Sequence, residues 1–161
     1  MSKKIEVSKG LCALVDDDDY EELNQYKWHA CKCKNTFYVN RTVSIPTKET
    51  ISMHRFITNA QKGQLVDHIN GDGLDNRRAN LRICTRSENG QNISSVSGKS
   101  RFKGVYFHKK NRNWVAEYRK NGKKYHLGCF TNEDDAARAY DSSVLMAFGE
   151  FAKTNAMLDL Y

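Results

Sequence analysis

Residues 67–89, DHINGDGLDNRRANLRICTRSEN, form the stretch that decides how this chain folds. Residues 64–66 lead into it as a short apolar strand, and residues 81–84 have the pattern of a second strand. Residues 70–73, Asn-Gly-Asp-Gly, are typical of a turn, because Gly adopts positive φ and Asn and Asp close turns with their side chains. Thr85 and Glu88 have the spacing of a capping box, which begins a helix. The sequence therefore predicts a strand–loop–strand–helix unit.

The polar side chains of this unit suit metal-assisted hydrolysis of a phosphodiester bond. Such a reaction needs a base that deprotonates water, and His68 is the candidate. It needs a group that fixes the imidazole tautomer, and Asn80 can accept from the ring N–H, with Asn76 in the loop as a competitor. It also needs oxygen ligands for a hard cation, and Asp67 and Asn89 are the candidates.

Two other interpretations of the loop were weighed against this one. A calcium-binding loop that starts at Asn70 would have Leu74 at position five and Leu81 at position twelve, where oxygen ligands are required. A polar surface turn beside an unrelated histidine would leave unexplained why the capping box brings Asn89 into the first turn of a helix. The hydrolytic interpretation is therefore favoured.

The composition indicates a small protein without a membrane partner. The chain has 161 residues, of which 39% are hydrophobic, enough for one or two small cores. No apolar run approaches the ~18 residues of a membrane span, and MSKKIEVSKG lacks the core of a signal peptide, so a cytoplasmic location is expected. The five cysteines are an odd number and scattered, which favours reduced thiols, and Cys31 and Cys33 have no second pair at zinc spacing.

Positive charge is concentrated in the second half of the chain. The net charge of the whole chain is +7, whereas residues 101–124 hold nine Lys and Arg and a single acid, Glu117, for a local net charge of +8. A local positive field of this kind attracts polyanions. The alternative for such a segment is a solvated basic face with no partner.

The second half also predicts a compact sheet with one helix. Residues 102–107, 114–119 and 124–130 have strand patterns, and Asn121-Gly122 is a strong hairpin signal. A helix follows, capped by Thr131 or Asn132 and closed by Gly149. Its apolar stripe is expected to pack on the sheet and consists of Ala137, Tyr140, Val144 and Phe148.

The first third predicts a small β-rich scaffold that completes the core of the strand–loop–strand–helix unit, which is too small to fold alone. Strands are expected over residues 10–15, 28–30, 37–40 and 50–53, with a short helix over residues 20–26. Residues 16–19, four aspartates, are expected to form a solvated helix start rather than a metal site. His54 either touches a phosphate or packs in the core, and the core position is favoured.

The segment with Asp67-His68, Asn80-Leu81-Arg82, Thr85 and Asn89 resembles the HNH homing-endonuclease family, with its ββα-metal (His-Me) finger, and in particular the phage and intron-encoded branch. The resemblance implies that His68 is the general base, that Asn80 orients it, and that Asp67 and Asn89 bind a divalent metal, magnesium or manganese. Asn89 stands where the family name has a histidine. The implied substrate is double-stranded DNA, cut to 5′-phosphate and 3′-hydroxyl ends, with Arg82 steadying the phosphate.

Residues 100–155 resemble the ethylene-response-factor (Apetala-two) DNA-binding domain of plant transcription factors. The matching segments are KGV at 103–105, WVAEYR at 114–119, LGCF at 127–130 and EDDAARAYD at 133–141. The resemblance implies a sheet lying in the major groove. Its contacts would be made by Lys103, Tyr106, His108, Arg119, Lys124 and His126.

Together these patterns predict an α+β protein with two modules. Residues 1–93 would form the nuclease domain around a finger core at 64–93, residues 94–100 a linker, and residues 101–156 the DNA-binding domain. We expect a monomeric, sequence-directed DNA endonuclease of phage homing type. The alternative is a DNA-binding regulator in which the finger is structural or inactive.

Overall fold

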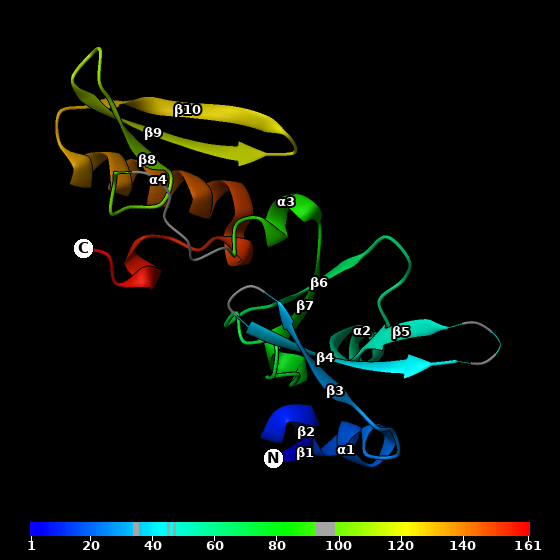
Figure 1. Ribbon diagram of the computed structural model, residues 1–161. Coiled ribbons are helices and arrows are strands. Elements are labelled where there is room, and N and C mark those ends of the chain that lie inside the picture. The colour runs from blue at the N-terminus through cyan, green and yellow to red at the C-terminus, as the bar shows by residue number, and fades with distance from the viewer. Residues whose placement is uncertain (34–35, 45, 47, 93–98) are drawn as a thin grey trace. The chain divides into compact units, whose positions relative to one another are not determined.

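The computed structural model describes residues 1–33, 36–44, 46, 48–92 and 99–161. The protein is a mixed α+β structure built from several small antiparallel sheets, as the sequence predicted (Figure 1). It divides into two compact units, Met1–Cys84 and Thr85–Tyr161.

In its described residues, the N-terminal unit contains three small sheets and two short α-helices. Strands β1 (Ser2–Glu6) and β2 (Cys12–Asp16) form a hairpin that leads directly into α1 (Asp17–Leu23). Strands β3 (His29–Cys33), β4 (Thr36–Val43) and β5 (Glu49–Ser52) form a second sheet, followed by α2 (Met53–Thr58). Strands β6 (Leu65–His68) and β7 (Leu81–Cys84) form the third. The two strands predicted around the polar loop are therefore confirmed.

Three elements of this unit differ from the sequence prediction. Strand β1 was not predicted, and Met53 begins α2 rather than ending a strand. The first helix starts at Asp17, three residues earlier than expected. Its early start is explained by charge, because aspartates in a first turn interact favourably with the helix dipole, and Asp19 accepts hydrogen bonds from the Arg78 guanidinium at 2.6 and 2.9 Å.

The core of the N-terminal unit is shared by elements from the whole unit rather than by β6 and β7 alone. Its most buried side chains include Val15 from β2, Leu23 from α1, Val39 from β4 and Met53 from α2. Leu81 of β7 is also a buried member of this cluster. A two-stranded hairpin with so few apolar residues could not bury a core of its own, so it depends on the preceding scaffold.

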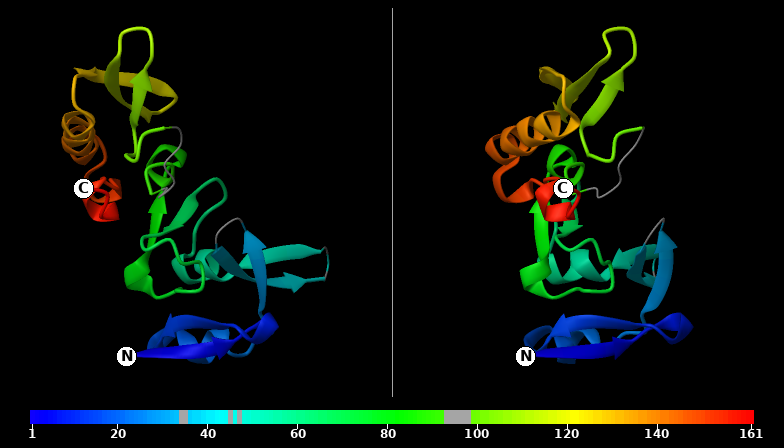
Figure 2. Two further views of the ribbon diagram at one scale, coloured as in Figure 1. Left: turned by 60° about the vertical axis from the view of Figure 1, so that its left-hand side comes forward. Right: turned by 90° about the vertical axis from the view of Figure 1, so that its left-hand side faces the viewer.

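The C-terminal unit contains α3 (Arg86–Asn89), β8 (Val105–His108), β9 (Asn113–Lys120), β10 (Lys123–Phe130) and α4 (Glu133–Phe148). The strands form one antiparallel sheet with β9 in the centre, and α4 lies along one face of it (Figure 2). Asn132 caps α4 by accepting from the Asp134 N–H at 2.8 Å, and Gly149 follows its last residue. The predicted apolar stripe is buried.

The two faces of this sheet have different compositions. Val105 and Ala116 face α4 and are buried with the helix stripe. Because side chains alternate along a strand, the opposite face of β9 carries Glu117 and Arg119. Arg119 lies opposite Lys124 in the register of β9 and β10. The predicted alternation of β9 is therefore confirmed, and the polar face is turned away from the helix.

The division into units falls at Cys84 and Thr85, so α3 is grouped with the C-terminal sheet. The sequence had assigned residues up to 93 to the first domain. Residues 93–98, which include most of the predicted linker, lie outside the described residues. The boundaries 1–93 and 101–156 stay predictions about which segments fold independently.

Among the residues that the structure describes, no helix has the length and apolar character needed to cross a membrane.

Gly104 provides a test of the packing in the C-terminal unit. It has φ of +74°, and a Cβ there would lie 2.0 Å from the Tyr140 ring. We expect Gly104→Ala to lower the free energy of unfolding by about 3 kcal/mol, because it adds left-handed strain to overpacking. Gly122→Ala is the matched control, since Gly122 has φ of +79° with open space around it, and it should cost about 1 kcal/mol. If urea denaturation showed equal losses of unfolding free energy for the two variants, the overlap of a Cβ at position 104 with the Tyr140 ring would be contradicted.

Candidate functional site

Asp67 and His68 end strand β6 and are both buried, with 6% and 4% of their surfaces exposed. The pairing of β6 with β7 sets Asp67 opposite Arg82. Two guanidinium nitrogens of Arg82 donate to the same carboxylate oxygen of Asp67, Oδ2, at 3.1 and 2.9 Å. This charge-assisted contact fixes the orientation of the Asp67 carboxylate.

The His68 ring is held by Asn76. Its Nε2 lies 3.4 Å from Asn76 Oδ1. Asn76 is itself fully buried, and its backbone N–H donates to the Leu14 carbonyl at 2.7 Å while its side-chain amide donates to the Gly73 carbonyl at 3.3 Å. In the tautomer that donates from Nε2 to Asn76, Nδ1 carries the lone pair that a general base requires.

Asn80, the predicted orienter of His68, makes its side-chain hydrogen bonds to other residues. Its Oδ1 accepts from the Asn70 backbone N–H at 3.0 Å, and its amide donates to Asn70 Oδ1 at 3.0 Å and to the Asp75 carbonyl at 2.8 Å. The carboxamide is thus bound at both ends to the loop between β6 and β7, where it fixes the loop that follows His68. Asn76, the competitor considered from the sequence, takes the place beside the imidazole.

The loop between β6 and β7 is hydrogen-bonded to β2 and α1. The Leu14 N–H donates to the Leu74 carbonyl at 2.8 Å. Asp75 accepts from the Arg77 guanidinium at 2.7 and 2.8 Å, and this pairing lowers the pKa of the Asp75 carboxyl below its ordinary value. The Arg78 backbone N–H donates to Asp16 at 2.7 Å. The predicted helix start at the aspartate run is confirmed, but the run is not simply solvated, because Asp19 is buried and binds the Arg78 guanidinium.

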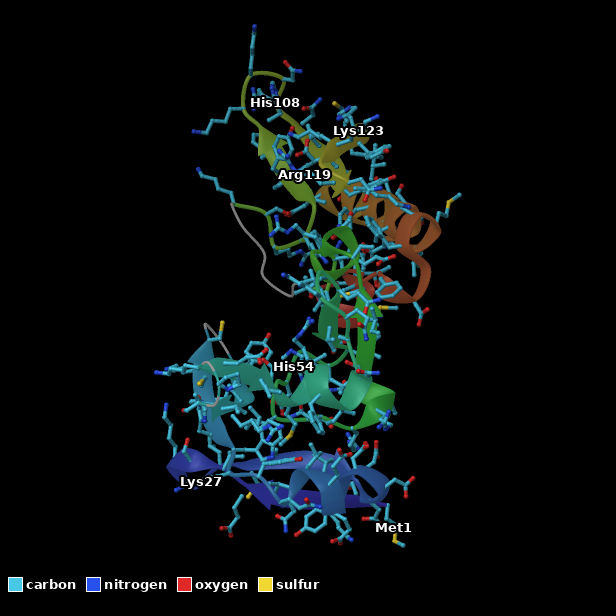
Figure 3. All side chains as sticks on the ribbon, turned by 90° about the vertical axis from the view of Figure 1, so that its right-hand side faces the viewer. Met1, Lys27, His54, His108, Arg119 and Lys123 are labelled. Atoms are coloured by element: carbon cyan, nitrogen blue, oxygen red, sulfur yellow. The ribbon has the colours of Figure 1, made fainter. Side chains whose placement is uncertain are left out.

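Two aromatic side chains that the sequence did not assign to the site surround His68. The ring centroids of His54 and His68 lie 5.2 Å apart, and the Tyr38 ring lies 5.7 Å from His54 and 5.6 Å from His68. Tyr38 comes from β4 and His54 from α2, where Figure 3 labels it. The sequence raised His54 as a core residue or a phosphate contact, whereas nothing in the strand pattern distinguished Tyr38 from its neighbours.

Burial keeps both imidazoles neutral at neutral pH. Desolvation lowers the pKa of His68, and the hydrogen bond to Asn76 and the nearby aspartates oppose this shift only in part. Desolvation, with the nearby His68 and Arg55, lowers the pKa of His54 to about 4. A neutral His68 is the protonation state that can accept a proton from water.

Asn89 lies in α3, within the C-terminal unit. The capping box is confirmed, because the Thr85 side chain accepts from the Glu88 N–H at 3.3 Å and the Glu88 carboxylate accepts from the Thr85 N–H at 2.8 Å. The pair of metal ligands, Asp67 and Asn89, stays a prediction. In the described part of the chain, no group of three or more His, Cys, Asp and Glu side chains is arranged to hold a metal ion.

Two of the residues predicted to touch DNA have other partners. The guanidinium of Arg82 is bound to Asp67, and the Arg82 side chain is only 11% exposed. Its contact with a phosphate stays a prediction. The Lys103 ammonium donates to the carbonyls of Gln91 and Lys153 inside the C-terminal unit. Burial lowers the pKa of Lys103 to about 8. The Lys103 side chain therefore binds inside the C-terminal unit and is not exposed on the sheet face opposite α4.

The other predicted contacts lie on the sheet face opposite α4: Tyr106, His108, Arg119, Lys124 and His126. Figure 3 labels His108, Arg119 and the neighbouring Lys123 on this sheet. Lys124 pairs with Glu117 at 2.8 Å, whereas the exposed guanidinium of Arg119 has no hydrogen bond or ion pair among the described residues. An unpaired guanidinium is the group best suited to a phosphate or a guanine edge. These roles stay predictions.

Comparison with known proteins gives two matches. Residues 54–91 match the sequence model of a family described as HNH endonuclease. Over 153 residues the chain is 33% identical to an uncharacterized HNH endonuclease of Acanthamoeba polyphaga mimivirus, and the alignment covers 91% of this chain and 76% of that protein. No solved structure matches the chain. The family match includes His54, Asp67, His68 and Asn76.

The low pKa of His54 predicts a specific pH dependence of stability. Because the folded state favours neutral His54, the unfolded state binds more protons between the unfolded value of 6.5 and the folded value of about 4. Stability is therefore present above pH 6.5 and lost as the pH falls, by roughly 2 kcal/mol between pH 7 and 5. In urea denaturation, His54→Leu should reduce this loss by about that amount. If His54→Leu lost as much stability as the wild type between pH 7 and 5, the predicted pH dependence would be contradicted.

Proposed function

This chain belongs to the HNH endonuclease family, and we propose that it is a metal-dependent endonuclease that cuts double-stranded DNA at sites selected by its C-terminal sheet. Family membership supports the nuclease activity. The observation that supports the mechanism most is the environment of His68, a buried imidazole with Nε2 facing Asn76 and with a neighbouring carboxylate held by Arg82.

His68 acts as the general base. A water molecule placed against Nδ1 loses a proton to the ring as its oxygen attacks the phosphorus, and the bond to the 3′ oxygen breaks. The 3′ oxygen takes a proton from solvent water, which leaves a 5′-phosphate and a 3′-hydroxyl. Asn76 keeps Nε2 engaged as a donor, so the lone pair stays on the reacting nitrogen. The Tyr38 and His54 rings exclude water from the side of the imidazole that they cover and so restrict its rotation.

Each of the two proposed ligands carries an oxygen donor of the kind that divalent metal ions prefer. Asp67 offers a buried carboxylate whose Oδ2 is fixed by Arg82, and Asn89 offers a carboxamide oxygen. Magnesium is commonly held by one or two carboxylates with the substrate phosphate and waters completing its shell, so a small protein set is sufficient. Asp67 and Asn89 would hold magnesium or manganese. When bound, the ion supplies Lewis-acid stabilisation to the phosphate and to the leaving oxygen.

The C-terminal sheet is proposed to bind DNA as the ethylene-response-factor domain does. The five face residues named above would enter the major groove. Among the residues that the structure describes, the Arg119 guanidinium has no protein partner. The viral origin of the mimivirus relative supports a phage or mobile-element role of homing type. One catalytic histidine per chain favours a monomer that makes one nick at each visit.

His68→Ala tests the assignment of the base. In a magnesium-dependent cleavage assay on a random duplex library, with ends identified by sequencing, we expect the variant to cut about 10²- to 10⁴-fold more slowly than the wild type. His29→Ala is the matched control, because His29 lies on β3 of the same unit and not among the Tyr38, His54 and His68 rings. The cleavage rate of His29→Ala should stay within about twofold of the wild-type rate. Wild-type rates from His68→Ala would remove His68 from the mechanism.

The same assay tests the metal ion and the alternative function. Excess EDTA should abolish cleavage and added magnesium should restore it. Cleavage that persists in EDTA would exclude the metal from the reaction. A protein that binds the library but nicks none of its members with magnesium or manganese would instead support the DNA-binding regulator.

Arg119→Ala tests the binding face. We expect weaker DNA binding and a salt dependence of log Kd reduced by about one phosphate contact. Arg138→Ala is the matched control, since Arg138 lies on α4 and its guanidinium packs on the Tyr161 ring. Both variants lose one positive charge, so only a contact made by the outer face separates them. Equal affinities at several salt concentrations would show that the face is misassigned.

A further inference from the structure

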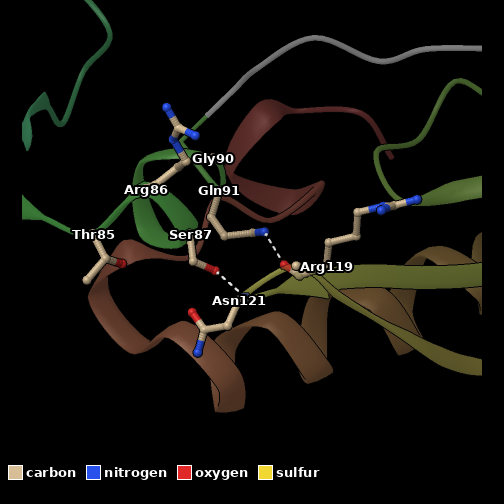
Figure 4. A pocket seen from close by; sticks show the side chains of 8 residues that line it. Thr85, Arg86, Ser87, Gly90, Gln91, Arg119 and Asn121 are labelled. Carbon is tan, nitrogen blue, oxygen red and sulfur yellow. Dashed lines mark hydrogen bonds between the residues drawn. The ribbon is translucent and has the colours of Figure 1, made fainter.

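Residues 85–92 are joined to the C-terminal sheet by side-chain hydrogen bonds (Figure 4). Ser87 Oγ, at the start of α3, accepts from the Asn121 N–H at 3.0 Å. Gln91, just after α3, donates from Nε2 to the Arg119 carbonyl at 3.2 Å. Asn121 belongs to the hairpin turn between β9 and β10, and Arg119 lies near the end of β9. Both ends of α3 are therefore tied to the same part of the sheet.

Gln91 makes further contacts with the rest of the unit. It is 7% exposed, and its Oε1 lies 3.4 Å from the Tyr140 hydroxyl of α4. Its carbonyl accepts from the Lys103 ammonium, which also donates to the Lys153 carbonyl at 3.1 Å. Both ends of the carboxamide and the main-chain carbonyl are thus used, and each contact goes to a different segment. A buried amide with this many partners holds one orientation.

The contacts matter because α3 is too short to be stable alone. Four residues make a single turn, and an isolated turn is unstable in water. Its order must come from the Ser87 and Gln91 contacts together with the capping box. Asn89, the proposed metal ligand, lies two residues before Gln91, and its backbone N–H donates to the Thr85 carbonyl at 3.0 Å. The orientation of Asn89 therefore depends on how α3 is held.

We propose that Gln91 is a positioning residue that locks α3 onto the DNA-binding sheet, so that Asn89 and the face that selects DNA move as one rigid body. The inference rests on the proposed function, because it assigns Asn89 to the metal and the outer face to DNA. Its consequence is that Asn89, as the proposed metal ligand, keeps a fixed offset from the bound sequence. If α3 moved independently of the sheet, this offset would vary.

Gln91→Ala in the full chain tests the proposal. At saturating DNA we expect the magnesium concentration for half-maximal cleavage to rise on the order of 10-fold, as for other residues that orient a metal ligand. The cleavage ends should spread from one position to several, while DNA affinity stays within about twofold. Gln25→Ala is the matched control, because the Gln25 amide, just after α1, donates to the Glu21 carbonyl on the surface. Unchanged magnesium dependence and cut position would overturn the proposal.

Two further measurements separate this inference from the proposed function. In hydrogen exchange, the amides of Asn89 and Gly90 should be protected in the wild type and exchange on the order of 10-fold faster in Gln91→Ala, with β9 amides unchanged. Unprotected α3 amides in the wild type would overturn the inference even if the protein cuts DNA. If the wild type never cuts, the proposed function fails and the exchange result alone decides. If Gln91→Ala does not fold, Ser87→Ala removes the hydrogen bond between Ser87 and the Asn121 N–H instead. The same changes in magnesium dependence, cut position and amide exchange are then expected of Ser87→Ala, and their absence would overturn the inference.

Discussion

The carboxamide of Asn80 is the constraint on which the geometry around His68 depends. Its three hydrogen bonds close the loop between β6 and β7 onto itself, through Asn70 and the carbonyl of Asp75. Each hydrogen bond contributes about 1 kcal/mol to stability, whereas a buried polar group left without its partner costs about 1–3 kcal/mol. The loop conformation is therefore specified mainly by the cost of leaving these buried groups unpaired. Asn76, the residue that faces His68, is presented by this closed loop.

A closed loop must also be attached to something larger. The hairpin of β6 and β7 contributes little to the apolar core, and the unit obtains most of its burial from β2, β4, α1 and α2. Backbone hydrogen bonds from Leu14 and the pairing of Arg78 with Asp16 and Asp19 connect the loop to β2 and α1. The aspartate run thus serves both as the start of α1 and as an anchor for the loop that presents the base.

The C-terminal unit shows how packing divides similar residues between structure and surface. Lys103 and Arg119 were both expected on the outer face. The Lys103 ammonium is enclosed and bound to backbone carbonyls, where it helps to hold Gln91 and α3. Arg119 is exposed on β9, and its contact with Gln91 is made by its main-chain carbonyl rather than by its guanidinium. The basic segment is therefore partly an internal framework and partly the proposed binding face.

The sequence by itself determined the features that are encoded locally. Each of these features depends on residues that are close together in the sequence, where backbone preference and periodicity decide the conformation. They are the Thr85–Glu88 capping box, the Asn121-Gly122 turn, the apolar stripe of α4 and the alternation of β9. The sequence also predicted the family, through the spacing of Asp67-His68, Asn80 and Asn89.

Only the tertiary structure decided which partners these residues have. Asn76 and Asn80 are chemically identical and both lie near His68 in the chain, and the folded loop brings Asn76 to the ring and turns Asn80 toward the backbone. Tyr38 and His54 reach His68 from β4 and α2. The physical reason is that a hydrogen bond or ring contact requires a separation of a few ångströms, and the distance between remote segments is set by the packing of the whole core rather than by local preference.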